Sequence, residues 1–358
     1  MEILDAVVIG AGQAGLSTSY HLARRGIPHV VLDADAAPGG AWQHRWDSLS
    51  MRDVHGVAAL PDSESPARDA DRANVVVPAY FGSFEREHRL PVLRPVRVGE
   101  VTDSPGGDGL LVVRAGDRTW TTRTVVNATG TWSQPHLPHY PGIETFGGEQ
   151  LHTVGYPGPA HFRDRRVVVV GGGASAVQLL GEIAPVAAGT LWVTRREPVW
   201  RTDDFSPEAG RAAVALVEQR VRRGLPPASV VSVTGLALRE QERAAAALGA
   251  YERHPMFIAV EPDGVRMADG SLWAADAILW ATGFRPAIAH LAPLHLRSEH
   301  GGVQLDGTTA VRDPRVQLVG YGPSASTIGA NRAGRVAARG VAAWLARSAD
   351  GERGASSA

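Results

Sequence analysis

The sequence contains no cysteine and no lysine, so all 36 of its Lys-or-Arg residues are arginine. Without cysteine the chain cannot form a disulfide, a thiolate nucleophile, a cysteine metal site or an iron–sulfur ligand set. Without lysine it cannot form a Schiff base with pyridoxal phosphate, and it lacks the lysine of a Walker phosphate-binding loop. The two absences exclude several classes of covalent, redox and nucleotide chemistry.

Neither sign of charge is in excess, because 37 acidic residues and 36 arginines leave a net charge of -1 over 358 residues. We therefore expect no nucleic acid or anionic membrane as the main partner. No apolar run approaches the ~18 residues of a membrane span, and the apolar start lacks a signal-peptide leader. The histidines show no metal-ligand spacing beside an acid, so no metal site is expected. These features predict a cytoplasmic protein of about two domains.

A glycine-rich turn follows the first apolar run of the chain. Residues 6–9 predict a buried parallel strand, residues 10–15 read GAGQAG, and a helical stretch and a second strand lead to Asp33. This order is typical of a dinucleotide-binding unit, in which the helix N-terminus faces a pyrophosphate and the acid accepts hydrogen bonds from a ribose. The predicted cofactor contacts here are Gly10, Gly12, Gln13, Ala14, Gly15 and Asp33.

The same pattern recurs later in the chain, with a different ending. Residues 166–170 predict a strand, residues 171–176 read GGGASA, and the next strand ends in Arg195 and Arg196. Guanidinium groups bind a 2′-phosphate that an acid would repel, so the first site is expected to hold FAD and the second NADPH. The alternative is that both arginines are solvated surface residues. The predicted contacts are Gly171, Gly173, Ser175, Ala176, Arg195 and Arg196.

The repeat predicts an α/β fold with two nested Rossmann-like dinucleotide-binding domains, as in a two-dinucleotide-binding flavoprotein. The FAD domain is expected at 1–155 and 285–347, with the NADPH domain inserted at 156–284. The small polar segment 348–358 predicts a disordered tail.

Between the two glycine turns, residues 146–156 read FGGEQLHTVGY. They match the fingerprint FxGxxxHxxx(Y/F), with Phe146, Gly148, His152 and Tyr156 at its defining positions. Residues 39–42, GGAW, match the GG-x-W element that this family places beside the flavin. The chain therefore resembles the class B flavin-dependent monooxygenases, especially compact members such as the plant YUCCA type and bacterial arsenic-operon enzymes.

This resemblance implies that NADPH reduces FAD, that the reduced flavin forms a C4a-hydroperoxide with O2, and that one oxygen atom passes to a small organic substrate. It implies that His152 and Tyr156 help lock the domains around NADPH. Two strands that end in Ala-Thr-Gly also match two-dinucleotide flavoproteins in general. The cofactor contacts it adds are Gly40, Trp42, Ala128, Thr129, Gly130, His152 and Tyr156.

The chain departs from the family pattern in two places. Tyr156 is typical of flavin-containing monooxygenases, whereas Pro157 is similar to Baeyer–Villiger enzymes, so N- or S-oxygenation and ketone oxygenation both stay open. The last strand, 316–320, is followed by YGPSAST rather than by the acid that many flavoproteins carry there. Gly322 and Ser326 are candidates for the flavin at this point, and Ser326 is equally a candidate helix cap.

The resemblance assigns the difficult chemistry to the flavin, so no acid–base residue is required. Arg52 and His55 are candidate catalytic residues, with a structural role as the alternative. Trp132, Trp200 and Tyr80 are candidate pocket aromatics or core residues. Because there is no cysteine pair, electrons must pass to a small acceptor. The expected partners are a small substrate and O2, and the oligomeric state stays open, with a homodimer as one alternative. The rival functions are an NADPH oxidase or reductase without oxygenation, and a redox-sensing flavoprotein.

Overall fold

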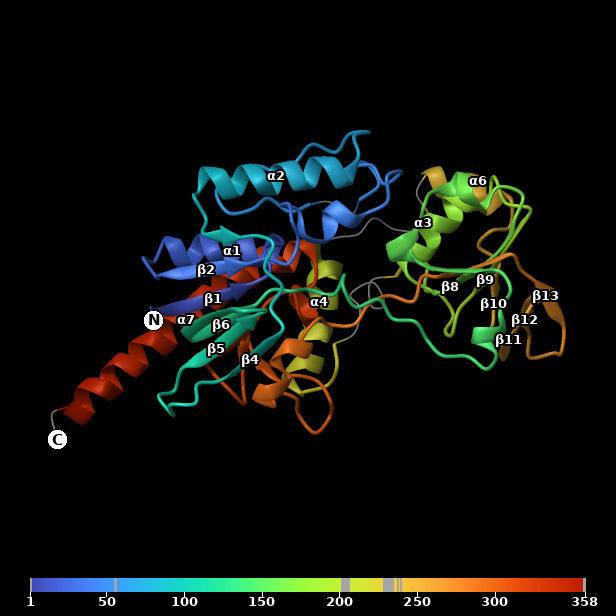
Figure 1. Ribbon diagram of the computed structural model, residues 1–358. Helices are drawn as coiled ribbons and strands as arrows, with labels where there is room; N and C mark the ends of the chain where they lie inside the picture. Colours follow the sequence, from blue (N-terminus) through green and yellow to red (C-terminus); the bar gives the residue numbers. More distant parts are fainter. Residues whose placement is uncertain are drawn as a thin grey trace. The chain divides into compact units, whose positions relative to one another are not determined.

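The computed structural model describes residues 2–54, 57–200, 207–227, 235–236, 238 and 240–356. The chain forms two compact units (Figure 1). Unit 1 comprises Met1–Ser133, Arg211–Val230 and Pro286–Ala358, and unit 2 comprises Gln134–Gly210 and Val231–Arg285. Each unit contains a parallel sheet and packed helices, so the predicted α/β class is confirmed.

The sheet of unit 1 is built around β1, which pairs in parallel with β2 on one side and β6 on the other. Its order is β15-β16-β17-β6-β1-β2-β3, and β4 and β5 form an antiparallel extension on β6. The apolar run of β1 is buried because neighbours cover it, as expected of a central parallel strand. The strands are β1 Ile3–Ile9, β2 His29–Leu32, β3 Val92–Leu93, β4 Glu100–Asp103, β5 Leu111–Ala115, β6 Arg118–Asn127, β15 Leu305–Asp306, β16 Thr309–Ala310 and β17 Val316–Leu318.

The direction of winding reverses at β1, because the strands that follow it lie on both of its sides. In open α/β sheets, ligands bind at the carboxyl ends of strands beside such a reversal. The first glycine turn leaves β1 at this point and leads into α1 (Gln13–Ala23). Helix α1 packs closely on α7 (Thr327–Ser356), where a Cβ on Gly334 would lie 2.6 Å from Ser17 Oγ. The remaining helices are α2 Ala73–Glu87 and α4 Pro207–Arg222, with 3₁₀ turns at Gly40–His44, Ala289–Leu294 and Gly322–Ser324.

Unit 2 repeats this arrangement around β8. Its parallel sheet has the order β10-β9-β8-β14-β7, so the winding reverses at β8 and the second glycine turn follows that strand. Helix α3 begins at the turn and packs against α6, and a separate antiparallel sheet contains β11, β12 and β13. The elements are β7 Glu149–His152, β8 Arg166–Val170, α3 Ala174–Ile183, β9 Gly189–Val193, α6 Glu240–Ala247, β10 Arg253–His254, β11 Ala259–Glu261, β12 Gly264–Arg266, β13 Leu272–Ala274 and β14 Ala277–Trp280, with 3₁₀ turns at Ile143–Thr145, Thr153–Gly155 and Pro159–Phe162.

The units differ from the predicted domain ranges in two segments. Residues 134–155, expected in the first domain, lie in unit 2 because β7 pairs with β14 along its whole length. Most of α4, expected in the inserted domain, lies in unit 1. There Val221 belongs to the main hydrophobic cluster, and Ser298 Oγ donates a hydrogen bond to the Gly224 carbonyl at 2.6 Å.

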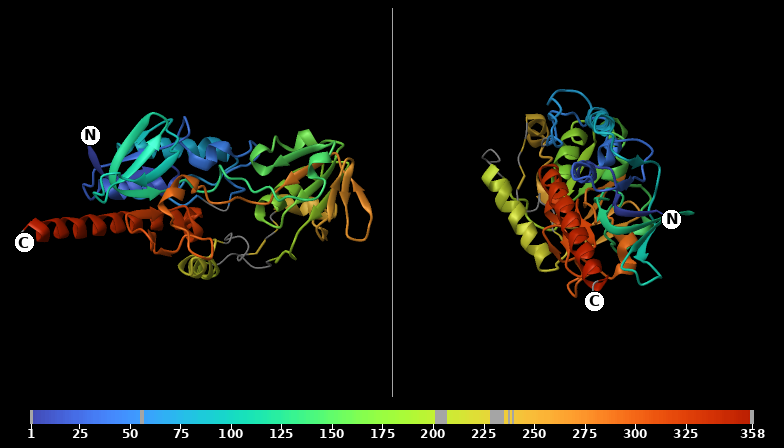
Figure 2. Two further views of the ribbon diagram at one scale, coloured as in Figure 1. Left: turned by 60° about the horizontal axis from the view of Figure 1, so that its bottom comes forward. Right: turned by 90° about the vertical axis from the view of Figure 1, so that its left-hand side faces the viewer.

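The C-terminal segment also differs from the expectation. Helix α7 continues to Ser356, where the sequence predicts a disordered tail from Ser348, and residues 357–358 lie outside the described part of the chain. The segment has no proline to end the helix, although its glycines and serines are weak helix formers. In Figure 2 (left) the end of α7 extends past the sheet of unit 1.

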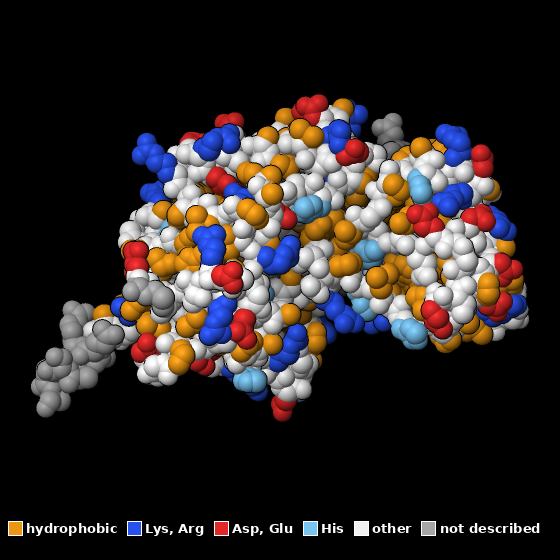
Figure 3. Space-filling model, viewed as in Figure 1, with side chains coloured by type: hydrophobic (Ala, Val, Ile, Leu, Met, Phe, Trp, Pro, Cys, Tyr) orange, Lys and Arg blue, Asp and Glu red, His pale blue; other side chains and the backbone are white. Residues whose placement is uncertain are grey.

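Acidic and basic side chains are interspersed on the face drawn in Figure 3, as the balanced composition predicts. None of the helices in the described residues is long and apolar enough to cross a membrane.

Candidate cofactor-binding sites

The first glycine turn is shaped by a contact with the end of β6. Gly10 has a φ of +101°, and a Cβ on it would lie 2.6 Å from the Ala128 carbonyl oxygen. A Cβ on Gly15 would lie 1.9 Å from the Gly10 carbonyl oxygen, so α1 begins in direct contact with the turn. A Cβ on Gly12 would meet nothing within 4 Å. Gly10 and Gly15 therefore serve packing, whereas Gly12 exposes its backbone to a space that a ligand can enter.

The start of α1 offers backbone donors to an anion. Gly12 is the N-cap, and no side chain caps the helix. The first N–H groups of a helix have no partner within it, and the helix dipole favours negative charge there. The Gln13 amide instead donates to the Ala58 and Thr327 carbonyls at 2.9 and 3.0 Å. Its side chain therefore ties α1 to neighbouring segments, while the helix start suits a pyrophosphate.

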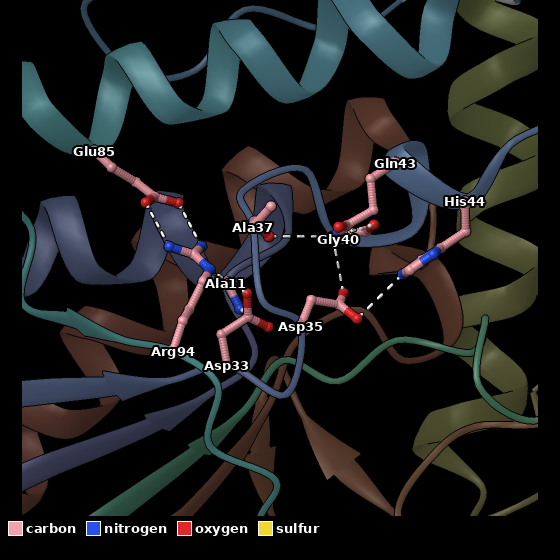
Figure 4. Close-up of polar contacts among 9 residues, drawn as sticks. All are labelled: Ala11, Asp33, Asp35, Ala37, Gly40, Gln43, His44, Glu85 and Arg94. Atoms are coloured by element: carbon pink, nitrogen blue, oxygen red, sulfur yellow. Dashed lines mark hydrogen bonds and ion pairs between the residues drawn. The ribbon is translucent and has the colours of Figure 1, made fainter.

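Asp33 lies at the end of β2 in a buried charge cluster (Figure 4). Its Oδ1 accepts from the Ala11 N–H at 3.4 Å, and its Oδ2 accepts from Arg94 Nε at 2.7 Å. Arg94 also donates to both Glu85 carboxylate oxygens, at 2.6 and 2.7 Å. Burial raises the pKa of Asp33, and the charge of Arg94 opposes that rise. A carboxylate has about four acceptor positions, so Asp33 can still accept bonds from a ribose.

Arg94 and Glu85 were missed by the sequence analysis because they lie far from the glycine motif. Although burial opposes it, hydrogen bonds and charge from Glu85 and Asp33 raise the pKa of Arg94. The guanidinium thus stays charged and holds the Asp33 carboxylate in one orientation. The one sequence signal for this cluster was that Arg94 directly follows β3, the strand that pairs with β2.

The GGAW loop packs directly on the first turn. A Cβ on Gly40 would lie 2.9 Å from Gly12 Cα, so this position has no room for a side chain. The Gln43 amide donates to Asp35 and to the Ala37 and Gly40 carbonyls, and His44 contacts Asp35 at 3.1 Å (Figure 4). These bonds hold the loop that carries Trp42 next to the predicted pyrophosphate site.

The second glycine turn repeats the geometry of the first. Gly171 has a φ of +135°, and its Cβ would lie 2.2 Å from the Ala281 carbonyl oxygen. A Cβ on Gly173, the uncapped N-cap of α3, would meet nothing within 4 Å. Ala176 is fully buried in the first turns of α3, and Ser175 beside it is half-buried. The structure therefore forms a second exposed helix start behind a tight turn.

Both predicted arginines are exposed directly after β9. Arg195 is close enough for its charge, with that of Arg285, to reinforce the lowering of the His136 pKa by burial. Arg253 on β10 was missed, and it fixes this turn. Its guanidinium donates to the Thr194 hydroxyl and carbonyl, each at 3.1 Å, and pairs with Glu197 at 3.1 Å. The site thus has a third arginine that positions the segment carrying the other two.

The two Ala-Thr-Gly strand ends make equivalent hydrogen bonds. Thr129 Oγ1 donates to the Ala287 carbonyl, and the Ala287 N–H donates to the Gly130 carbonyl, at 2.6 and 2.9 Å. In unit 2, Thr282 Oγ1 donates to the His136 carbonyl, and the His136 N–H donates to Gly283. Each motif therefore anchors the segment next to a boundary between the units, at 133/134 or 285/286.

Two side chains of the fingerprint, His152 and Tyr156, are buried in unit 2. His152 Nε2 lies 3.1 Å from the Gly283 carbonyl, and burial lowers the His152 pKa. The Tyr156 hydroxyl donates to Glu182 on α3 at 3.0 Å, its ring stacks on Phe162, and burial with the Glu182 charge raises its pKa. The pair thus supports β14 and α3 from within unit 2, and the predicted locking role stays a prediction.

The other predicted residues lie as follows. Arg52 is exposed, and its N–H donates to the Asp69 carbonyl, while His55 lies outside the described residues. Ser326 Oγ accepts from the Gly329 N–H at 3.1 Å, which is the capping alternative, and a Cβ on Gly322 would meet Val221. Among the described residues, no group of three or more acidic or histidine side chains is placed to hold a metal.

The candidate pocket aromatics have structural partners. The Tyr80 hydroxyl accepts from the Leu60 N–H at 2.7 Å, and Trp200 packs edge-on against Trp192 and Tyr251. Trp132 instead stacks on Arg45, whose guanidinium carbon lies 4.4 Å from the ring centroid. Only Trp132 of these three thus contacts a charged group next to the first site.

Comparison with known proteins agrees with this geometry. A family model described as pyridine nucleotide-disulphide oxidoreductase matches residues 7–225. The chain belongs to this family. It is 38% identical to a flavin-containing monooxygenase from Stenotrophomonas maltophilia, with a TM-score of 0.82 over 96% of this chain and 100% of that one.

Two further matches are more distant. An uncharacterized oxidoreductase CzcO from Bacillus subtilis is 25% identical over 78% of this chain and 81% of its own length. The structure of OTEMO in complex with FAD and NADP is 17% identical, with a TM-score of 0.66 over 96% of this chain and 85% of that one, and it supports the fold alone.

The full-length match confirms the predicted relationship to flavin-dependent monooxygenases and the predicted oxidoreductase class. The nested two-dinucleotide fold is likewise confirmed. The family description includes disulphide chemistry, but this member has no cysteine and cannot pass electrons through a dithiol pair. No comparison tests the individual site residues, so their roles stay predictions.

The glycines of the first turn should separate folding from cofactor binding. We expect Gly12→Ala to fold normally, because its Cβ enters open space, but to lose bound flavin, because that space admits the pyrophosphate. Gly15→Ala should unfold at a markedly lower urea concentration, because its Cβ collides with the Gly10 carbonyl. Circular dichroism in urea and the flavin-to-protein absorbance ratio measure the two effects. A Gly12→Ala protein with wild-type flavin content would contradict this assignment.

Arg94→Gln should destabilise unit 1 by about 3 kcal/mol, because it leaves two buried carboxylates without their shared counter-charge. It should also lower flavin retention by disordering Asp33. The matched control is Arg114→Gln, which breaks an exposed pair with Glu100 and should cost under about 1 kcal/mol. Urea denaturation and flavin content are the readouts, and equal effects of both substitutions would argue against the cluster.

Proposed function

We propose that unit 1 binds FAD, that unit 2 binds NADPH, and that the enzyme inserts one oxygen atom from O2 into a small organic substrate, by N- or S-oxygenation or Baeyer–Villiger oxygenation. The observation that carries this proposal is the pair of equivalent glycine turns followed by opposite charges. A buried acid follows the first turn, and exposed arginines follow the second. The full-length likeness to a flavin-containing monooxygenase supports it.

The residues of unit 1 fit FAD. The open space at Gly12 and the uncapped start of α1 suit a pyrophosphate. Asp33, oriented by Arg94, suits a ribose, since its hydroxyls can donate to the carboxylate. Gly40 and Trp42 stand at the same end of β1, where we place the flavin.

The residues of unit 2 fit NADPH. The open space at Gly173 and the start of α3 again suit a pyrophosphate. Arg195 and Arg196 suit the 2′-phosphate because a guanidinium binds its oxygens bidentately, and Arg253 holds Thr194, the residue directly before them. If Arg195 and Arg196 were only solvated surface residues, the bonds from Arg253 to this turn would have no role in binding.

When bound, the flavin supplies hydride acceptance from NADPH and the activation of O2. The protein residues bind and orient. The two helix starts place negative phosphates, the Asp33 cluster places the adenosine end, and the GGAW loop holds Trp42 beside Gly12. Because no cysteine pair is present, the electrons reach a small acceptor directly. Location in the cytoplasm and a homodimer stay predictions, as do the roles of Arg52 and His55.

Oxygen transfer can be measured without knowing the natural substrate. The purified enzyme should be incubated with NADPH, ¹⁸O₂ and a panel of amines, sulfides and ketones. We expect at least one product to carry a single ¹⁸O atom, with less hydrogen peroxide released than NADPH consumed. If peroxide accounts for all the NADPH with every compound, and no product is labelled, the enzyme is an oxidase. NADPH consumption that stays negligible with every acceptor would favour the sensor alternative.

Replacing Arg195 and Arg196 together by Ser tests the coenzyme assignment. The KM for NADPH should rise by at least about tenfold, because charge-assisted hydrogen bonds to the 2′-phosphate are lost. The KM for NADH, which lacks that phosphate, should change less than about twofold. Arg222→Ser, at an exposed arginine of α4, is the control and should change neither value. Equal rises for both coenzymes would remove the 2′-phosphate assignment.

A further inference from the structure

Arg45 lies three residues after Trp42 of the GGAW loop, and its backbone is firmly held. Its N–H donates to the Trp42 carbonyl at 3.1 Å, and its carbonyl accepts from the Asn74 amide at 2.9 Å. The backbone of Arg45 is therefore fixed next to the first predicted cofactor site. The contacts of its guanidinium then show what the side chain can bind.

The Arg45 guanidinium lies against two tryptophan rings. Its central carbon is 4.4 Å from the centroid of Trp132 and 5.6 Å from that of Trp42. Trp42 belongs to the GGAW loop, and Trp132 follows two residues after Gly130 of the Ala-Thr-Gly motif. Two segments that we place at the flavin thus converge on this one cation within unit 1.

This guanidinium has no acidic partner in the part of the chain that the structure describes. Its Nε is inaccessible to solvent and has no hydrogen-bond partner, and the described residues form no ion pair or side-chain hydrogen bond with it. Burial alone lowers the pKa of Arg45, to about 10. Indole rings attract a cation but accept no conventional hydrogen bond from its N–H edge.

Other shielded arginines of unit 1 are paired. Arg94 has Asp33 and Glu85, and Arg315 has Asp103 and Asp313. A buried cation without an anion is costly, and an unsatisfied buried donor in a native protein needs an explanation, such as a bound ion or ligand. Arg45 thus keeps an anion-binding group that the side chains of the described residues do not fill.

We propose that Arg45 binds the carboxylate of an organic-acid substrate, whose apolar or aromatic body packs beside Trp42 and Trp132. The two terminal nitrogens form the planar fork that accepts a carboxylate through two parallel hydrogen bonds. The proposal rests on the proposed function and narrows its substrate class. Arg45 is here a binding and specificity residue.

Isothermal calorimetry on the oxidised, flavin-loaded enzyme tests this with phenylacetate and its uncharged isostere phenylacetamide. We expect phenylacetate to bind at least tenfold more tightly than the amide. Arg45→Gln should remove that preference and leave the amide affinity within twofold, while Arg45→Lys should keep part of it because it retains the charge. Flavin absorbance and the urea midpoint check that each variant is folded.

Arg118→Gln is the matched control, because Arg118 also lies over a tryptophan, 4.9 Å from the Trp120 centroid, but is exposed on β6. It should keep the full preference for phenylacetate. Equal wild-type affinities for acid and amide, no binding of phenylacetate, or a preference that survives in Arg45→Gln would each overturn the proposal. The calorimetry uses neither NADPH nor O2, so a failure of oxygen transfer leaves this outcome readable by itself.

Discussion

Both glycine turns depend on one contact, in which a carbonyl oxygen at the end of a parallel strand lies against the first glycine. Ala128 supplies it in unit 1 and Ala281 in unit 2, and neither leaves room for a side chain. The tight turn lets the following helix begin at the carboxyl edge of the sheet. That edge is where the winding reverses and where the helix dipole is positive. The phosphate sites that we propose thus follow from backbone packing, before any charged side chain is considered.

Charge then distinguishes the two sites, and arginine performs every cationic role. A guanidinium carries five donors and stays protonated, so one side chain can hold two partners. Arg94 joins two carboxylates in a shielded cluster, and Arg253 joins a hydroxyl, a carbonyl and an exposed acid. In a chain without lysine, arginines such as Arg94 and Arg253 thus form several hydrogen bonds and ion pairs each.

The parts of the fold that the sequence predicted are those fixed by local pattern. Valine runs and glycine spacing predicted both strand–turn–helix units, because strand, turn and helix are contiguous there. Long-range pairing could not be predicted in this way. Nothing near residue 149 shows that β7 joins β14, and nothing in the sequence of α4 shows that Val221 enters the core of unit 1. Arg94, Glu85 and Arg253 were missed for the same reason, since each reaches its site from a neighbouring strand or helix. The Ala-Thr-Gly repeats were noticed, but their support of the glycine turns appears only in three dimensions.

The segments that the Ala-Thr-Gly motifs anchor have a consequence for the insertion of unit 2 in the sequence of unit 1. The ends of the inserted segment are neighbours, since the Arg285 N–H donates to the Gln134 carbonyl at 2.8 Å and Pro135 pairs with Phe284. The inserted stretch therefore leaves and rejoins unit 1 at neighbouring residues, so connecting its two ends costs little closure entropy. Between these ends, α4 returns to unit 1. An exchange of unit 2 that leaves unit 1 intact must therefore retain α4, because Val221 on that helix packs in the core of unit 1.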